Sequence, residues 1–163
     1  MDCRERNIMV AYFSTAGVTK AAAEKVAAAT GGKLFEIQPA EPYTEADLDW
    51  RVKDSRCNNE WNDQSIRPAL AKKAHCPGKY DTFFIGFPIW YGVYPAIVQT
   101  FLDSLKLAGK NVVFFCTSGG SSAGKAIEYA KGKTKDADRI CWLDDKLLND
   151  CGEEDVAAWV ANL

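Results

Sequence analysis

Apolar runs at three places in this chain constrain its fold more than any other feature of the sequence. They span Ile8–Phe13, Thr82–Phe87 and Val112–Cys116, and a weaker run spans Arg139–Leu143. Runs that lack a polar face are typical of strands buried on both faces of a sheet. Such strands belong to parallel sheets, which need helices on both sides, so the runs predict an α/β protein.

Segments with helical periodicity separate the runs. The first, Thr19–Thr30, is rich in alanine and is closed by two glycines. The other predicted elements are a short strand at Leu34–Ile37, one or two helical turns at Ala69–Ala74, and helices at Pro95–Leu105, Gly124–Lys131 and Glu153–Leu163. Strands that alternate with helices predict a doubly wound parallel sheet. Residues 1–163 contain no internal repeat, and we expect a single domain.

Composition and charge exclude several classes of protein. A chain of 163 residues suits one domain, which buries roughly 70% of its unfolded surface. The net charge of -2 offers no basic footprint for nucleic acid. The N-terminal residues lack the apolar core of a signal peptide. The most apolar stretch, 83–98, is shorter than the roughly 20 residues of a membrane span and contains glycine and proline. We therefore expect a cytoplasmic protein without a membrane partner.

The cysteines and the single histidine argue against metal and hydrolase sites. Six cysteines are scattered without a CxxC pair, which suits neither zinc nor a disulfide scaffold, so we expect reduced structural thiols. His75 lies in a polar stretch with lysines, and we expect a solvated imidazole. A Ser-His-Asp hydrolase or a site with several histidines would depend on His75 alone.

The loop after the first run, "STAGVT" (14–19), joins a buried strand to a helix. The first turn of a helix leaves up to four backbone N–H groups unpaired, and the helix dipole adds roughly half a positive charge there. Ser14, Thr15 and Thr19 add hydroxyl groups, and Gly17 lets a ligand approach the backbone closely. These features indicate a phosphate cradle. A plain capped helix is the alternative, because Ser and Thr are also preferred helix caps.

Three other phosphate-handling patterns do not fit this loop. A Walker loop requires G-x-x-x-x-G-K-[ST], whereas Gly17 stands alone and Lys20 follows Thr19. The G-x-G-x-x-G pattern of dinucleotide-binding folds is also absent. A response-regulator receiver needs an acidic pair after its first strand, and none is present here.

Two further loops are expected at the same edge of the sheet. In doubly wound sheets, ligands bind beyond the carboxyl ends of the strands. The loop after Phe87 contains Trp90 and Tyr91, and flat aromatic rings suit a flat conjugated ligand. The alternative is that Trp90 caps the core beneath the loop. The loop after Cys116, "TSGGSSAG", is rich in glycine.

Together these three loops resemble those of the flavodoxin family. "YFSTAGVTK" is similar to the family's phosphate loop, "GFPIWYGVYP" and "TSGGSSAGKA" to the loops beside its flavin ring, and "EPYTEADLDWRVKDSR" to an extended segment after the second strand. The resemblance covers nearly the whole chain. It implies a five-stranded sheet in the order 2-1-3-4-5 with non-covalent FMN at its carboxyl edge.

Carried over to this chain, the resemblance assigns two groups of cofactor-binding residues. The residues expected to bind the phosphate are Ser14, Thr15, Ala16, Gly17, Val18 and Thr19. The residues expected beside the flavin ring are Pro88, Ile89, Trp90, Tyr91 and Gly92 on one side and Thr117, Ser118, Gly119, Gly120 and Gly124 on the other. Ala16 departs from the family pattern T-x-T-G-x-T, which removes one hydroxyl contact. Because FMN carries the electrons, no catalytic side chain and no metal site are expected.

The resemblance implies an electron-transfer flavoprotein that works between redox protein partners. An FMN-dependent NAD(P)H or quinone oxidoreductase is the alternative, and a non-redox module for another phosphate compound is a third. The chain is nearly neutral, whereas electron-carrying flavodoxins are strongly acidic.

Segment 41–63 has seven acids against three bases, together with Trp50 and Trp61. It is either a solvated helical lid or a cover whose Trp50 or Arg56 reaches over the ligand.

Overall fold

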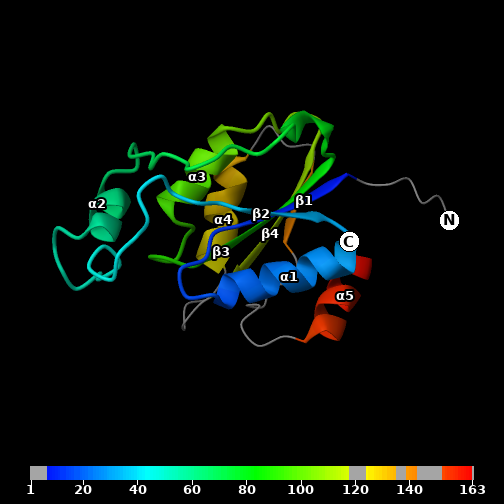
Figure 1. Ribbon diagram of the computed structural model, residues 1–163, viewed down its shortest axis with the longest axis horizontal. Helices are drawn as coiled ribbons and strands as arrows, with labels where there is room; N and C mark the ends of the chain where they lie inside the picture. Colours follow the sequence, from blue (N-terminus) through cyan, green and yellow to red (C-terminus); the bar gives the residue numbers. More distant parts are fainter. Residues whose placement is uncertain (1–6, 118–123, 135–138, 143–151, 163) are drawn as a thin grey trace.

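A parallel sheet with helices on both faces forms the centre of the computed structural model (Figure 1). The structure describes residues 7–117, 124–134, 139–142 (backbone only) and 152–162. The elements are β1 (Ile8–Tyr12), α1 (Val18–Thr30), β2 (Lys33–Glu36), α2 (Arg56–Asn62), the 3-10 turn η1 (Pro77–Lys79), β3 (Thr82–Pro88), α3 (Ala96–Asp103), β4 (Asn111–Thr117), α4 (Gly124–Lys133), β5 (Arg139–Trp142) and α5 (Glu153–Ala161).

The strand order is β2-β1-β3-β4-β5, and every neighbouring pair is parallel. The expectation of an α/β protein with a parallel sheet is confirmed. In the register, Tyr12 of β1 lies opposite Gly86 of β3, and Pro88 of β3 lies opposite Thr117 of β4. The loops that follow β1, β3 and β4 therefore start at the same edge of the sheet.

Alternating side chains of the central strands enter two separate cores. Met9 and Ala11 pack with Ile97 of α3 and Ala126 of α4. Val10 and Tyr12 face the opposite side. There they pack with residues of α1 and α5, including Ala22, Ala23, Val26 and Val156. Figure 1 shows α1 and α5 on one side of the sheet and α3 and α4 on the other. Burial on both faces explains why the interiors of these strands are apolar at successive positions.

Segment 69–74 contradicts the sequence-based expectation of helical turns. Leu70 instead forms an isolated antiparallel bridge with Pro39, and the Ala71 N–H donates to the Gln38 carbonyl at 2.7 Å. The chain just beyond β2 thus supplies hydrogen-bond partners for backbone groups that a helix would have paired within itself. Short apolar stretches carry too little periodicity to reveal such a long-range pairing.

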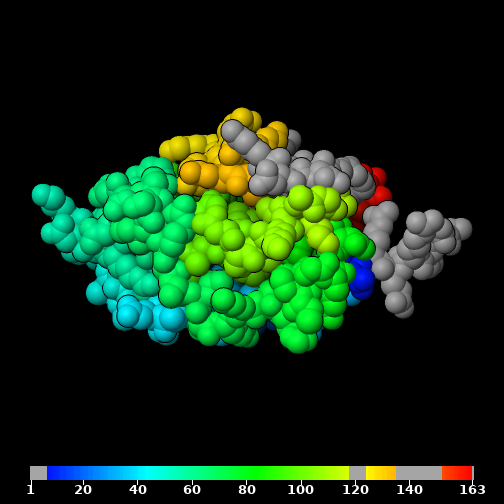
Figure 2. Space-filling model, turned by 90° about the horizontal axis from the view of Figure 1, so that it is seen from above, coloured from blue at the N-terminus to red at the C-terminus, as the bar shows by residue number. Residues whose placement is uncertain are grey.

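Segment 41–63 forms one end of the molecule, and α5 lies toward the other end (Figures 1 and 2). It consists of turns followed by the short helix α2, so the expectation of a helical lid holds only for its last third. In the described part of the chain, no helix is both long and apolar enough to cross a membrane.

Candidate functional site

The loop between β1 and α1 ends at Gly17, which caps the helix with a φ of 87°. The Ser14 hydroxyl oxygen accepts a hydrogen bond from the Gly17 N–H at 3.1 Å, which closes the loop into a tight turn. A Cβ atom at position 17 would meet nothing within 4 Å. Glycine is therefore favoured by the left-handed backbone, and its open side faces free space.

The first turn of α1 presents backbone N–H groups that lack partners. Among the described residues, the amides of Val18, Thr19 and Lys20 donate no hydrogen bond. The cap has no side-chain hydrogen bond, and the first turn contains no acidic residue. These donors and the positive end of the helix dipole make the turn suitable for an anion.

Thr19 ties this turn to the end of β4. Its side chain is 2% exposed, and its hydroxyl group shares a 2.7 Å hydrogen bond with the Thr117 hydroxyl. The Ile89 N–H in turn donates to the Thr117 carbonyl at 2.8 Å. Thr117 thus connects the loops after β1 and β3. The Thr19 hydroxyl is engaged with Thr117, so its role as a phosphate ligand stays a prediction.

The loop after β3 contains a tight turn at Trp90–Val93. The N–H groups of Trp90 and Val93 each donate to the other residue's carbonyl, at 2.9 and 3.0 Å. The two central residues have positive φ angles, 54° at Tyr91 and 81° at Gly92, as a type I′ turn requires. A positive φ at a tyrosine is uncommon, and it fixes the direction in which the Tyr91 side chain leaves the turn.

Trp90 joins this turn to the core. It makes edge contacts with the rings of Phe13 at 5.5 Å and Tyr43 at 5.4 Å between ring centroids. It is half-buried and packs against the core on the α3 side of the sheet. The same side chain also lines the larger cavity described below. Trp90 therefore caps the core and also lines a cavity, and its contact with a bound ligand stays a prediction.

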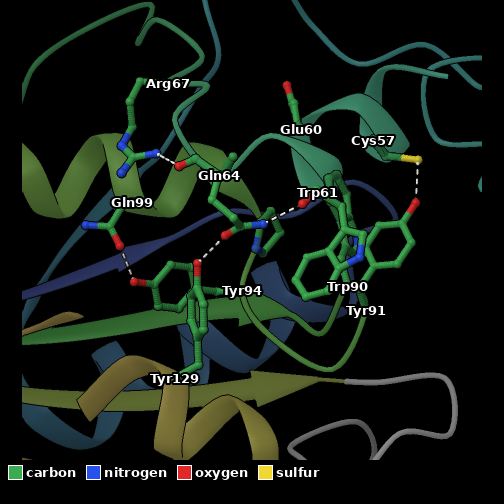
Figure 3. A pocket seen from close by; sticks show the side chains of 12 residues that line it. Cys57, Glu60, Trp61, Gln64, Arg67, Trp90, Tyr91, Tyr94, Gln99 and Tyr129 are labelled. Carbon is green, nitrogen blue, oxygen red and sulfur yellow. Dashed lines mark hydrogen bonds between the residues drawn. The ribbon is translucent and has the colours of Figure 1, made fainter. Parts of the chain in front are cut away.

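Tyr91 joins the turn to α2. Its ring stacks on Trp61 with centroids 5.3 Å apart and planes within 7° of parallel. Its hydroxyl group donates to Asn58 and lies 3.4 Å from the Cys57 sulfur (Figure 3). Burial, with the Cys57 thiol contributing, raises the pKa of the Tyr91 phenol above its ordinary value. Tyr91 is therefore a neutral hydrogen-bond donor at physiological pH.

An open cavity of about 390 Å³ lies between these elements, within the range of roughly 300–1,000 Å³ typical of ligand sites. Its wall combines the loop after β1, the turn after β3 and segment 41–63. The lining residues are Thr15, Leu48, Trp50, Cys57, Ile89, Trp90 and Tyr91. Trp50 is 70% exposed, so most of its indole ring has no protein partner. The cavity is thus mainly apolar and aromatic.

A polar cluster of Tyr43, Arg56 and Glu60 ties the two ends of segment 41–63 together, and the Tyr43 ring packs on Phe13 at the end of β1 with ring centroids 5.7 Å apart. Glu60 is 7% exposed; it accepts hydrogen bonds from the Tyr43 hydroxyl at 2.7 Å and from Arg56 at 3.1 Å. The Arg56 guanidinium also lies 3.9 Å from the centre of the Tyr43 ring. Burial raises the pKa of Glu60, against the opposing effects of Tyr43 and Arg56. Arg56 therefore anchors the segment, and Trp50 is the residue that lines the cavity.

Trp90 and Tyr91 also line a smaller cavity of about 30 Å³, which has room for about one water molecule (Figure 3). Around it, the Tyr129 hydroxyl donates to Gln64 at 2.7 Å and the Tyr94 hydroxyl donates to Gln99. The first bond connects the chain just after α2 to α4, and the second connects the loop after β3 to α3. They support the turn after β3 from behind.

The structure brings the two predicted groups of residues together only in part. Thr15, Ile89, Trp90 and Tyr91 share the larger cavity. Gly124 is exposed at the start of α4. Ser118, Gly119 and Gly120 lie outside the described residues. Sequence reasoning missed Leu48 and Cys57, because neither belongs to a recognisable pattern.

Clusters of residues able to hold a metal ion are absent from the described ranges of the chain. Three free thiols are described, at Cys57, Cys76 and Cys116. His75 is exposed, as expected, and its ring lies 3.4 Å from the Cys76 sulfur. These side chains are not gathered around the larger cavity, apart from Cys57.

Comparison with solved structures finds close relatives over nearly the full chain. A candidate flavoprotein from Bacteroides eggerthii is 46% identical, with a TM-score of 0.89 and 96% of each chain covered. A candidate flavoprotein from Bacteroides uniformis is 41% identical, with a TM-score of 0.86 and coverage of 95% of this chain and 97% of that one. A flavoprotein from Lactobacillus acidophilus, solved in complex with FMN, shares the fold at 20% identity, with a TM-score of 0.71 and coverage of 95% and 99%.

Among curated proteins, none matches this chain. A family model does match: that of the flavodoxins, over residues 7–163. It spans the three loops that start at the carboxyl edge of the sheet. The chain therefore belongs to the flavodoxin family.

Proposed function

We propose that this protein binds FMN non-covalently and carries electrons between redox protein partners. The observation that carries the proposal is the 390 Å³ cavity, which joins Thr15 of the loop before α1 to Trp90 and Tyr91 of the turn after β3. One end of this site suits a phosphate group and the other suits a flat ring. FMN has both features in one molecule.

The phosphate end fits FMN through backbone donors. A phosphate dianion needs several N–H donors, and the amides of Val18, Thr19 and Lys20 are free of partners among the described residues. Gly17 leaves open space beside them. The hydroxyl groups of Ser14 and Thr15 add donors at the rim of the same turn. Ala16 contributes only its backbone amide.

The ring end fits FMN through its aromatic walls. Trp90 and Tyr91 line the cavity from the turn after β3, and Leu48 and Trp50 line it from segment 41–63. When bound, FMN supplies the electron chemistry. The chain's own residues bind the phosphate, orient the ring and exclude water from its faces. None of them is required to act as a general acid or base.

The carrier role is favoured by the lack of a second nucleotide cradle in the sequence. Beyond the three loops there is no glycine-rich turn, and there is no arginine cluster suited to a 2′-phosphate. The N-terminus of α5 carries Glu153, Glu154 and Asp155 in its first turn, which repel an anion. The exposed indole of Trp50 at the cavity leaves one apolar edge for a protein partner.

Steady-state kinetics separates the carrier from the reductase. The FMN-loaded protein is mixed with NADH or NADPH and a water-soluble quinone, with and without an added NAD(P)H-dependent reductase protein. We expect negligible direct turnover and rapid electron transfer when the added reductase supplies electrons. Direct turnover at ordinary enzymatic rates, on the order of 1–10³ s⁻¹, would instead establish an NAD(P)H or quinone oxidoreductase.

A further inference from the structure

Lys125, in the first turn of α4, contacts the turn after β3. Its ammonium group donates a hydrogen bond to the Tyr91 carbonyl at 3.3 Å. Its aliphatic stem packs so closely on Gly92 that a Cβ atom there would lie 2.9 Å from the Lys125 Cδ. Lys125 therefore touches both residues of the peptide at the tip of the turn.

The same ammonium group lies 5.2 Å from the centre of the Trp61 ring, which stacks on Tyr91. One positive charge thus connects α4, α2 and the turn after β3. Tyr91 in turn lines the larger cavity. Removal of Lys125 would loosen a wall of the proposed cofactor site without removing any lining side chain.

Helix stability does not explain a lysine at this position. The first turn of a helix carries a partial positive charge, so a cation there is disfavoured by about 0.3–1 kcal/mol. Within the described part of the chain, no carboxylate forms an ion pair with Lys125. The charge is therefore not neutralised by a described neighbour, and a ligand at the cavity would experience it.

The bond to Tyr91 also fixes the orientation of one peptide group. A trans peptide is planar, so its N–H points away from its C=O. With the Tyr91 carbonyl held toward Lys125, the Gly92 N–H faces the opposite side of the turn. The residue acts on the site in two ways, by this orientation and by its charge.

We propose that Lys125 is a positioning residue of the cofactor site that raises the affinity for reduced FMN relative to oxidised FMN. The proposal rests on the proposed binding of FMN. Reduction of the flavin by dithionite transfers two electrons and, near neutral pH, is accompanied by uptake of one proton. The reduced ring therefore carries one more negative charge than the oxidised ring. A nearby cation stabilises the more negative form, and by linkage the affinity ratio sets the potential of bound relative to free FMN.

The test compares the dissociation constants for oxidised and dithionite-reduced FMN, measured by anaerobic titration of apoprotein at low ionic strength. Lys125→Met removes the charge and the donor, Lys125→Gln keeps a donor, and Lys125→Arg keeps the charge. Lys131→Met, at the far end of α4, is the matched control. In the Met and Gln variants, we expect the ratio of the affinity for reduced FMN to the affinity for oxidised FMN to fall about 3–10-fold. The Arg and Lys131→Met variants should stay within about twofold of wild type.

A second measurement uses the apoprotein alone. Hydrogen exchange of the Trp90 and Val93 amides, which close the turn, should be faster in Lys125→Met than in wild type and unchanged in Lys131→Met. The proposal is overturned if Lys125→Gln keeps the wild-type ratio of affinities, or if Lys125→Met weakens both redox forms equally. Failure of wild type to bind oxidised FMN would instead overturn the proposed function, and the inference with it.

Discussion

Gly17 is the residue on which the phosphate end of the site depends most. It caps α1 with a φ of 87°, and the space beside it is open. We predict that Gly17→Asp abolishes FMN binding and leaves the fold intact. The carboxylate would repel the phosphate dianion at close range, whereas aspartate tolerates a left-handed backbone better than most residues. FMN titration and circular dichroism measure the two effects.

Gly17→Asn is the matched control for that change. Asparagine has nearly the same shape and accepts the same backbone, but it has no charge. It should weaken binding much less than aspartate does. Stoichiometric FMN in purified Gly17→Asp protein would show that the phosphate lies elsewhere.

Trp50 and Trp90 line the same cavity but differ in what else they support. Trp50 is 70% exposed, whereas Trp90 packs on Phe13 and Tyr43. We predict that Trp50→Ala weakens FMN binding by about 1–2 kcal/mol with little change in apoprotein stability. Trp90→Ala should weaken binding by about 1–3 kcal/mol and also lower the melting temperature.

Flavin fluorescence provides the second readout for both variants. A nearby indole quenches the flavin, so bound FMN should be brighter in each variant than in wild type. Unchanged affinity and unchanged brightness in Trp90→Ala would leave Trp90 as a core cap only. The same result for Trp50→Ala would remove segment 41–63 from the site.

Residue types at strand ends made much of the site predictable. Ser14, Gly17 and Trp90 stand out because small, hydroxylated or aromatic residues interrupt apolar runs. Leu48 and Cys57 were not predictable, because they reach the cavity through the path of segment 41–63. In the sequence, nothing distinguishes Lys125 from an ordinary surface lysine. Its contact with Tyr91 is visible only in the structure.

At the scale of elements, segment 41–63 depends on the buried cluster of Tyr43, Arg56 and Glu60. Burial raises the pKa of Glu60 above its ordinary value of 4.5. Between 4.5 and the raised value, the folded protein holds a proton that the unfolded chain has released. The contribution of Glu60 to stability is therefore fully present below pH 4.5 and falls as the pH rises through this window.

We predict that Glu60→Gln removes this pH dependence, because glutamine does not titrate. As the pH rises from 4.5 through the window, the melting temperature of wild type should fall relative to that of Glu60→Gln. Thermal unfolding at several pH values measures it, with the exposed Glu45→Gln as the control. A difference that is constant with pH would mean that the Glu60 pKa is not raised.

The pattern of elements was more predictable than the path of the long connection. Apolar runs located β1, β3 and β4 to within about two residues, because burial on both faces leaves a strong signal. Segment 69–74 was predicted as helical turns, but it pairs with the chain after β2. The position of α2 also escaped prediction, because polar residues dominate the segment and its anchors come from distant residues.

At the scale of the whole molecule, the doubly wound topology assembles the site from remote parts of the chain. Thr19 and Thr117 share a hydrogen bond across 98 positions of sequence. The net charge of -2 provides little long-range steering toward a charged partner. Contact with a redox partner would therefore depend on short-range contacts near Trp50.

Titration of the apoprotein with FMN, followed by flavin fluorescence, determines whether this chain binds FMN through its phosphate. We predict saturable binding of one FMN per chain with a Kd of about 1 μM or below. Riboflavin, which lacks the phosphate, should bind at least about tenfold more weakly, because it cannot use the amides at the start of α1. Absence of saturable binding, or equal affinity for FMN and riboflavin, would contradict the account.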